Sequence, residues 1–202
     1  YGIKDFCYHY FMHSADMTFD MHENKVIYHN SHAEPLKVTV VDTGLNTMTG
    51  GRIKKIQPYV GDDSFLLTYG DGVSNINIPE LIRKHEASGK IATLTAVQPS
   101  GKFGALQITD QNQITAFKEK PQGDGTWING GFFVCEPKVF DYIKDGDATI
   151  WERGPLEGIA HDGGLNAYRH TGFWKPMDTL RDKFELNEMW EEHKAPWKVW
   201  ND

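Results

Sequence analysis

An apolar run that stops at a Gly-Asp-Gly turn is the feature that most constrains how this chain can fold. Residues 65–69 read Phe-Leu-Leu-Thr-Tyr, and Gly70, Asp71 and Gly72 follow directly. A short apolar run bounded by turn residues is typical of a buried strand. In α/β sheets, ligands bind in the crevice beyond the carboxyl ends of strands. We therefore expect Asp71 to enter such a crevice, where the glycines leave room for a metal ion and a phosphate. An ordinary Asp-Gly turn is the alternative.

The segments that follow alternate between helix-like and strand-like patterns. Residues 78–85 have a helical period, with Pro79 near their start and Gly89 after their end, and residues 91–97 form an apolar, threonine-rich run. A strand, helix, strand order predicts a parallel or mixed α/β sheet. The other expected strands are 18–21, 25–28, 38–43, 103–108, 114–117, 128–134 and 165–170, and the other expected helices are 53–59, 139–143, 151–160 and 180–193.

Length and composition exclude several classes of protein. A chain of 202 residues can bury one sizeable core, and 39% hydrophobic with 24% charged residues is ordinary for a globular protein. The net charge of −7 argues against nucleic acid as a partner. No apolar run approaches the ~20 residues that span a bilayer, so we expect no membrane partner. Cys7 and Cys135 lie far apart without metal-ligand spacing, which favours free thiols in a reducing cytoplasm.

Two motifs offer contacts for a phosphate. The Thr-Gly-Gly-Arg sequence at 49–52 precedes an expected helix, whose backbone N–H groups can bind an anion, although a simple helix start is favoured at least equally. Lys118, Glu119 and Lys120 end a strand before Pro121. A lysine at a strand end can hold a phosphate as a point charge, whereas a solvated sheet edge is the alternative.

A second turn-borne carboxylate, Asp178, lies just before the expected C-terminal helix. Taken alone, this position favours a helix N-cap. Together, however, Asp71 and Asp178 would make a site for a hard cation, suited to Mg²⁺ that bridges substrate phosphates.

These pieces occur together in one family. They are the segments 41–44, 48–52, 68–73, 103–105, 119–121, 128–133 and 174–182. The chain resembles the sugar-1-phosphate nucleotidylyltransferases over nearly all of residues 18–200. The Glu-Lys-Pro piece is shared across the wider superfamily. The Thr-Gly-Gly-Arg, Tyr-Gly-Asp-Gly-Val and Pro-Met-Asp-Thr-Leu-Arg pieces together look specific to the cytidylyltransferase branch.

The resemblance implies a fold and a reaction. The fold would be a three-layer, Rossmann-like α/β nucleotidyltransferase domain with a mixed, mainly parallel central sheet. The reaction would join CTP and α-D-glucose 1-phosphate into CDP-glucose with release of pyrophosphate, as in nucleotide-sugar biosynthesis for O-antigen and lipopolysaccharide. The sugar phosphate would attack the α-phosphorus in line, without a covalent enzyme intermediate. A homo-oligomer is also implied, with a hexamer as the form considered.

The resemblance also implies roles for individual residues. Asp71 and Asp178 would hold Mg²⁺, and Lys120 would hold the sugar phosphate, which makes these three the expected catalytic residues. The expected substrate-binding residues are Thr68, Tyr69, Gly104, Glu119, Lys120, Asn129 and Gly130. The expected nucleotide-binding residues are Arg52, Tyr69 and Gly70.

One departure from the family pattern is large. The family opens with a strand and a Gly-Gly-x-Gly-Thr-Arg loop followed by a Lys-Pro motif, and neither this loop nor a Lys-Pro after it occurs ahead of residue 18. We therefore expect residues 1–202 to be a single nucleotidyltransferase domain that lacks this N-terminal glycine-rich unit and a further segment near residues 6–7.

Other functions stay open at this point. A UTP- or dTTP-dependent enzyme of the same fold is one, because base choice depends partly on the missing loop. A non-catalytic sugar-nucleotide-binding protein is another, although it would not need two metal-binding carboxylates. A glycosyltransferase is disfavoured, because such enzymes carry a close Asp-x-Asp pair. The C-terminal tryptophans, Trp190, Trp197 and Trp200, are equally compatible with a subunit interface and with packing onto the chain's own core.

Overall fold

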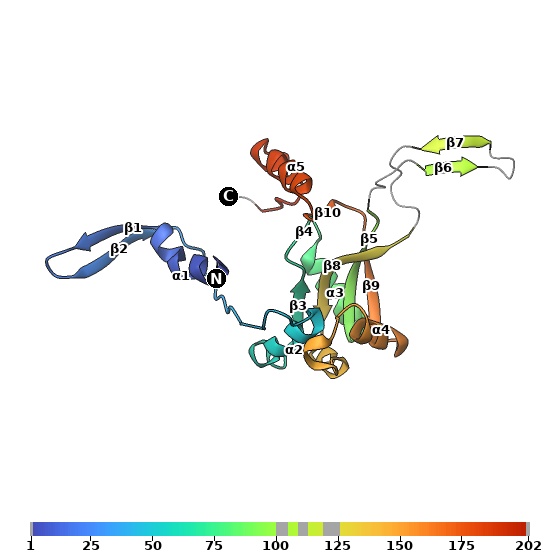
Figure 1. Ribbon diagram of the computed structural model, residues 1–202, viewed down its shortest axis with the longest axis horizontal. Coiled ribbons are helices and arrows are strands. Elements are labelled where there is room, and N and C mark those ends of the chain that lie inside the picture. The colour runs from blue at the N-terminus through green and yellow to red at the C-terminus, as the bar shows by residue number, and fades with distance from the viewer. Residues whose placement is uncertain (1, 100–104, 109–112, 119–125, 201–202) are drawn as a thin grey trace. The chain divides into compact units, whose positions relative to one another are not determined.

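The computed structural model describes residues 2–99, 105–108, 113–118 and 126–200. They belong to two compact units, Tyr1–Gly44 and Leu45–Asp202. The first unit consists of helix α1 (Gly2–His13) and an antiparallel hairpin of β1 (Ala15–Asp20) and β2 (Lys25–Ser31) (Figure 1). This hairpin confirms the strand pair expected there. Helix α1 runs through residues 6 and 7, and both the single domain and the segment missing near 6–7 stay predictions.

The strand expected at residues 38–43 is wrong. Residues 32–44 form neither helix nor strand, and Val38 is 61% exposed. The β-branched residues of this segment suit a strand only where a neighbouring strand supplies cross-strand contacts. Within the described chain, no strand pairs with this segment, so its propensity is not expressed.

The second unit is built on a mixed four-stranded sheet. Its order is β3 (Phe65–Thr68), β8 (Ile128–Cys135), β5 (Ala92–Val97) and β9 (Leu165–His170). Strand β8 runs antiparallel to both neighbours, whereas β5 and β9 are parallel. The carboxyl ends of β3, β5 and β9 therefore meet the start of β8 at one edge of the sheet. This is the edge at which ligands bind in α/β folds.

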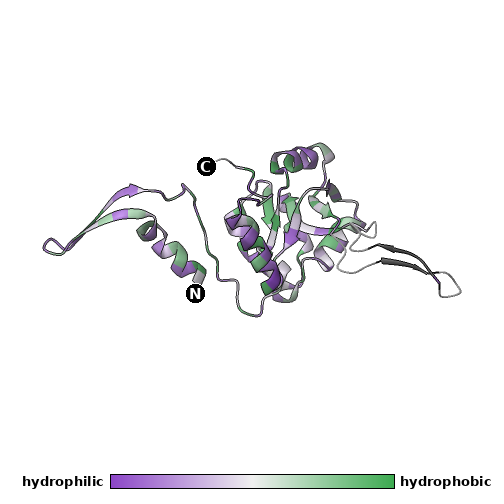
Figure 2. Ribbon diagram, turned by 90° about the horizontal axis from the view of Figure 1, so that it is seen from above, coloured by the Kyte–Doolittle hydropathy of each residue, from purple (hydrophilic) through white to green (hydrophobic). Residues whose placement is uncertain are grey.

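Helices cover both faces of this sheet. Phe133 packs with Ile53 of α2 on one face, and its neighbour Val134 packs with Leu81 of α3 on the other. Adjacent strand residues point to opposite faces, so the two clusters lie on either side and the three-layer arrangement is confirmed. Figure 2 shows hydrophobic residues along the central strands and both kinds of residue on the helices. The helices are α2 (Thr49–Val60), α3 (Ile78–Ser88), α4 (Gly154–His161) and α5 (Leu180–Glu191), with 3₁₀ helices η1 (Pro137–Tyr142) and η2 (Gly146–Ala148).

Within the described residues of the second unit, two strand pairs lie outside the central sheet. Strand β4 (Gly72–Ser74) pairs antiparallel with β10 (Trp174–Pro176), and β6 (Ala105–Ile108) pairs antiparallel with β7 (Ile114–Lys118) (Figure 1). The second pair confirms the expected hairpin. The first pair joins segments about a hundred residues apart, and it carries the candidate site.

A buried histidine ties α3 to the sheet. The His85 side chain is 2% exposed. Its Nδ1 lies 2.9 Å from Thr93 Oγ1, and its Nε2 lies 2.9 Å from Glu136 Oε1. The Ser64 hydroxyl donates a further hydrogen bond of 2.7 Å to the same carboxylate. The hydrogen bonds from His85 and Ser64 lower the pKa of Glu136 below its ordinary value of 4.5.

Glu136→Gln is expected to lower the free energy of unfolding at neutral pH by about 1 kcal/mol, because a charged acceptor is lost from a partly exposed cluster. The folded-state pKa of Glu136 is depressed, so the stabilisation is present above pH 4.5 and is lost as the pH falls through the folded value. Urea unfolding of both proteins across this range should show their stabilities converging in acid. A difference that stays constant down to about pH 3 would contradict this account.

Candidate active site

The β4–β10 ladder brings the two predicted carboxylate segments together. Gly72 pairs with Pro176, and one step further the Met177 N–H donates a 2.8 Å hydrogen bond to the Asp71 carbonyl oxygen. Asp178 is the next residue along. The backbones that carry Asp71 and Asp178 therefore meet at one end of a two-stranded ladder.

Neither carboxylate is committed to another structural role. Thr179, not Asp178, is the N-cap of α5, in a capping box with Asp182. The N-cap interpretation of Asp178 is therefore wrong. Asp71 and Asp178 are exposed, and their carboxylates form no hydrogen bond or ion pair with any residue that the structure describes. Mg²⁺ is commonly held by one or two carboxylates together with substrate phosphates, so these oxygen donors fit such an ion.

A hydrogen-bond network lies immediately before the Asp71 turn. The Tyr69 hydroxyl donates to Glu152 Oε1 at 2.5 Å and accepts from Asn129 Nδ2 at 3.1 Å. The other carboxylate oxygen of Glu152 accepts a 3.0 Å hydrogen bond from the Thr49 hydroxyl. Burial raises the pKa of Tyr69, and the hydrogen bond to Glu152 raises it further. The phenol therefore stays protonated and remains a donor.

The Asn-Gly-Gly sequence that opens β8 is shaped by this network. Gly131 has a left-handed φ of +78°, and a Cβ there would lie 2.7 Å from the Tyr69 ring. The Asn129 side-chain oxygen accepts a 2.9 Å hydrogen bond from the Gly131 N–H. The Trp174 indole N–H donates to the Gly130 carbonyl at 2.8 Å. Strand β10 is thereby tied to the start of β8.

The Thr-Gly-Gly-Arg motif forms the first turn of α2, which begins at Thr49 rather than at residue 53. The N–H groups of Gly50 and Gly51 both donate to the Thr149 carbonyl, at 2.9 and 3.2 Å. A Cβ on Gly50 would lie 2.7 Å from the Thr149 side chain. These N–H groups are occupied, so the interpretation of the motif as an anion site is wrong and the simple helix start holds. Arg52 is exposed and donates to the Leu45 carbonyl at 3.2 Å.

The remaining predicted residues divide into two groups. Thr68 and Gly70 are exposed on either side of Tyr69, and the Thr68 hydroxyl donates to the Tyr69 carbonyl at 3.1 Å. The residues predicted near the β6–β7 hairpin lie outside the described residues: Gly104, Glu119 and Lys120.

Sequence reasoning left several members of the candidate site unassigned. Glu152 was expected within a helix over 151–160, but α4 begins at Gly154 and leaves Glu152 in the turn before it. The local pattern gives no signal for its role, because its partners come from distant segments. Thr49 and Trp174 were also not assigned, although both lie inside motifs that carry the family resemblance.

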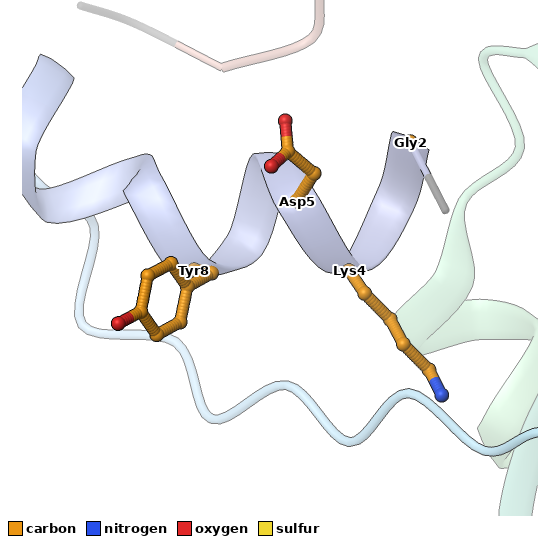
Figure 3. A pocket seen from close by; sticks show the side chains of 4 residues that line it. All are labelled: Gly2, Lys4, Asp5 and Tyr8. Atoms are coloured by element: carbon orange, nitrogen blue, oxygen red, sulfur yellow. The ribbon is translucent and has the colours of Figure 1, made fainter.

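The first unit has a hollow of its own. It has a volume of about 470 Å³, lies beside α1, and is lined by Gly2, Lys4, Asp5 and Tyr8. The Lys4, Asp5 and Tyr8 side chains point apart rather than toward one point (Figure 3). The described residues of this hollow therefore offer no convergent set of polar groups for a ligand.

Comparison with known proteins identifies the family. Residues 10–160 match the model of the nucleotidyl transferase family. The chain belongs to this family. It is 54% identical over 201 residues to a glucose-1-phosphate cytidylyltransferase of Salmonella typhi, covering 99% of this chain and 77% of that protein. It is also 48% identical over 168 residues to a probable glucose-1-phosphate cytidylyltransferase of Bacillus subtilis, covering 83% and 65%.

Two solved structures share the fold of this chain. HddC from Yersinia pseudotuberculosis matches with a TM-score of 0.53 at 19% identity, over 72% of this chain and 64% of that chain. A putative glucose-1-phosphate thymidylyltransferase from Bacillus anthracis matches with a TM-score of 0.50 at 18% identity, over 82% and 65%. At this identity the likeness concerns the fold alone. The expected nucleotidyltransferase fold with a mixed central sheet is confirmed.

Proposed function

We propose that this enzyme transfers the cytidylyl group of CTP to α-D-glucose 1-phosphate, giving CDP-glucose and pyrophosphate. The observation that carries this proposal is 54% identity, across 99% of the chain, to a protein named for that activity. The two carboxylate segments at the end of the β4–β10 ladder add physical support, because Asp71 and Asp178 could together hold Mg²⁺. Transfer of a nucleotidyl group requires such a positive charge at the reacting phosphate.

The chain's own residues would bind, position and neutralise charge. Asp71 and Asp178 would hold Mg²⁺, which when bound would stabilise the negative charge on the α-phosphate. A sugar phosphate oxygen would attack the α-phosphorus in line as pyrophosphate leaves, so no nucleophile from the protein is needed. Rate enhancement would come from orientation of the two substrates and from electrostatic stabilisation.

The other predicted residues would surround the two substrates. Arg52, Tyr69 and Gly70 would contact the nucleotide. Lys120 would hold the phosphate of the sugar. The residues proposed to line the sugar side are Thr68, Tyr69, Gly104, Glu119, Asn129 and Gly130.

A nucleotide panel tests the proposal. Pyrophosphate release by the full-length protein would be measured with glucose 1-phosphate, Mg²⁺ and each of CTP, UTP, dTTP and ATP. We expect the highest kcat/KM with CTP. A preference for UTP or dTTP would favour the alternative enzymes of the same fold. Binding of CDP-glucose without any turnover would favour the non-catalytic alternative.

Lys120→Ala is expected to raise the KM for glucose 1-phosphate about tenfold or more while changing the KM for CTP little. The reason is that a point charge on the sugar phosphate would be lost. Steady-state kinetics with each substrate varied in turn measures both constants. Lys90→Ala, at an exposed position on the same unit, is the control. An unchanged KM for glucose 1-phosphate would remove Lys120 from the site.

The edge of the central sheet at β3 is open among the described residues. Strand β3 lies at one edge of the sheet formed by the described residues, and Leu66 on it is 53% exposed. An apolar hollow of about 190 Å³ beside it is lined by Leu66, Leu81 and Phe132, among others. We propose that the strand preceding the glycine-rich loop of the family pairs with β3 and covers this hollow, because an open apolar edge favours a further strand.

The C-terminal aromatic residues support a homo-oligomer, with a hexamer as the form to be tested. Trp197 packs on Phe173 with ring centroids 5.4 Å apart, while Trp190 and Trp200 remain 47% and 52% exposed. Half-exposed tryptophans are enriched at subunit interfaces.

Across the described part of the chain, the helices are too short and too polar to cross a bilayer. We propose that the enzyme acts in the cytoplasm.

A further inference from the structure

Glu152 links three of the segments that carry the family resemblance, those with Thr49, Tyr69 and Asn129. Its carboxylate accepts one hydrogen bond from Thr49, at the start of α2, and one from Tyr69, at the end of β3. Tyr69 in turn accepts a hydrogen bond from Asn129, at the start of β8. A single half-buried carboxylate therefore connects α2 with the two strands that border the candidate site.

A carboxylate at position 152 affects how firmly the neighbouring Tyr69 hydroxyl is held. A half-buried charge is costly unless it is well paired. The two side chains that donate to Glu152, those of Thr49 and Tyr69, are neutral hydroxyls. The 2.5 Å separation from Tyr69 is typical of a hydrogen bond to an ionised acceptor, which is about twice as strong as a neutral one. The charge therefore strengthens the orientation of the Tyr69 hydroxyl.

Tyr69 is placed to transmit this orientation to the carboxylate pair. Its ring lies against Gly131, and its N–H donates to the Gly131 carbonyl at 3.0 Å. Only Gly70 separates Tyr69 from Asp71. A firmly held Tyr69 fixes one end of this short turn, and the hydrogen bond from the Met177 N–H to the Asp71 carbonyl oxygen fixes the other.

We propose that Glu152 is a positioning residue for cytidylyl transfer, acting through the Tyr69 hydroxyl to hold the turn that carries Asp71. This inference rests on the proposed function. Glu152 itself touches neither substrate in this account. Its loss should weaken catalysis and raise the Mg²⁺ requirement, because residues that orient metal ligands typically account for about ten- to hundredfold in activity or metal affinity.

The test compares Glu152→Ala, Glu152→Gln, Tyr69→Phe and the double variant of Tyr69→Phe with Glu152→Ala. We expect Glu152→Ala to lower kcat about ten- to hundredfold and to raise the half-saturating Mg²⁺ concentration, while the KM values for CTP and glucose 1-phosphate change less than about threefold. Glu152→Gln should retain part of kcat, because its amide oxygen can still accept from Tyr69. Glu157→Gln, exposed on α4, is the matched control.

The double variant separates positioning from general stability. If Glu152 acts through Tyr69, the double variant should be no slower than the slower single variant, because both changes break the same hydrogen bond. Additive losses, or an unchanged kcat in Glu152→Ala, would overturn the inference. A loss of kcat fully explained by a lower unfolding midpoint would overturn it too. A wild-type protein that forms no CDP-glucose would instead reject the proposed function, and the inference with it.

Discussion

Asp71→Asn and Asp178→Asn are each expected to lower kcat by at least about a hundredfold, because a metal clamp supplies several kcal/mol of charge stabilisation. Both carboxylates are exposed at one end of the β4–β10 ladder, and neither is used by a described neighbour. Asparagine keeps the size of each side chain and removes its charge. The measurement is kcat for CDP-glucose formation at saturating CTP, glucose 1-phosphate and Mg²⁺.

Asp63→Asn is the matched control, since Asp63 is an exposed aspartate in the loop before β3. We expect it to leave kcat unchanged. The unfolding midpoints of both site variants should stay close to that of the wild type, because exposed carboxylates contribute little to stability. A site variant that keeps both its kcat and its dependence on Mg²⁺ would exclude that aspartate from the metal site.

Trp151→Ala is expected to lower the free energy of unfolding by about 3–5 kcal/mol, the usual cost of removing a buried aromatic side chain. Trp151 has no exposed surface and lies in the cluster that joins α2, η1 and α4 to the sheet. Its ring meets Phe133 edge-on, with centroids 6.1 Å apart. Urea unfolding at neutral pH measures the loss.

Two further variants serve as comparisons for the loss of unfolding free energy in Trp151→Ala. Trp151→Phe should cost less than Trp151→Ala, because it leaves a smaller cavity and removes an indole N–H that has no hydrogen-bond partner among the described residues. Trp190→Ala should also cost less, because Trp190 is 47% exposed on α5. Equal losses at Trp151 and Trp190 would show that the cluster around Trp151 is not the main core of this unit.

The parts of the fold that the sequence predicts well are those whose pattern reflects burial. The strand at 165–170 was placed at its observed bounds, and the runs at 91–97 and 128–134 differ from the observed strands by a single residue. Their apolar side chains face helices on both sides, so the runs carry the signal directly. Helix α3 was found because Pro79 marks its start and Gly89 its end.

The errors arise where distant residues decide the outcome. Two glycines made 49–52 resemble a turn before a helix, yet they belong to the helix because α2 packs tightly against Thr149. The β-branched segment 38–43 resembles a strand but finds no partner within the described chain. Local propensity describes only what a segment favours by itself. Tertiary packing overrides it at 49–52, and at 38–43 it lacks the cross-strand contacts that a strand needs.

The candidate site likewise contains residues with a local sequence signal and residues whose role depends on distant partners. That the segments with Asp71 and Asp178 meet could be predicted, because both motifs occur in the family that the chain resembles, whereas their role as metal ligands stays a prediction. Asp178 was ambiguous until the structure assigned the N-cap to Thr179. Glu152 could not be predicted, since its partners Thr49 and Tyr69 lie 103 and 83 positions earlier in the chain.

The most direct test of the central claim is identification of the product. The full-length protein would be incubated with CTP, α-D-glucose 1-phosphate and Mg²⁺, and the nucleotide products would be separated and identified by mass spectrometry. The account predicts CDP-glucose and pyrophosphate in equal amounts, with product formation abolished by removal of the divalent metal. Hydrolysis of CTP without any sugar nucleotide, or undiminished CDP-glucose formation after metal removal, would contradict it.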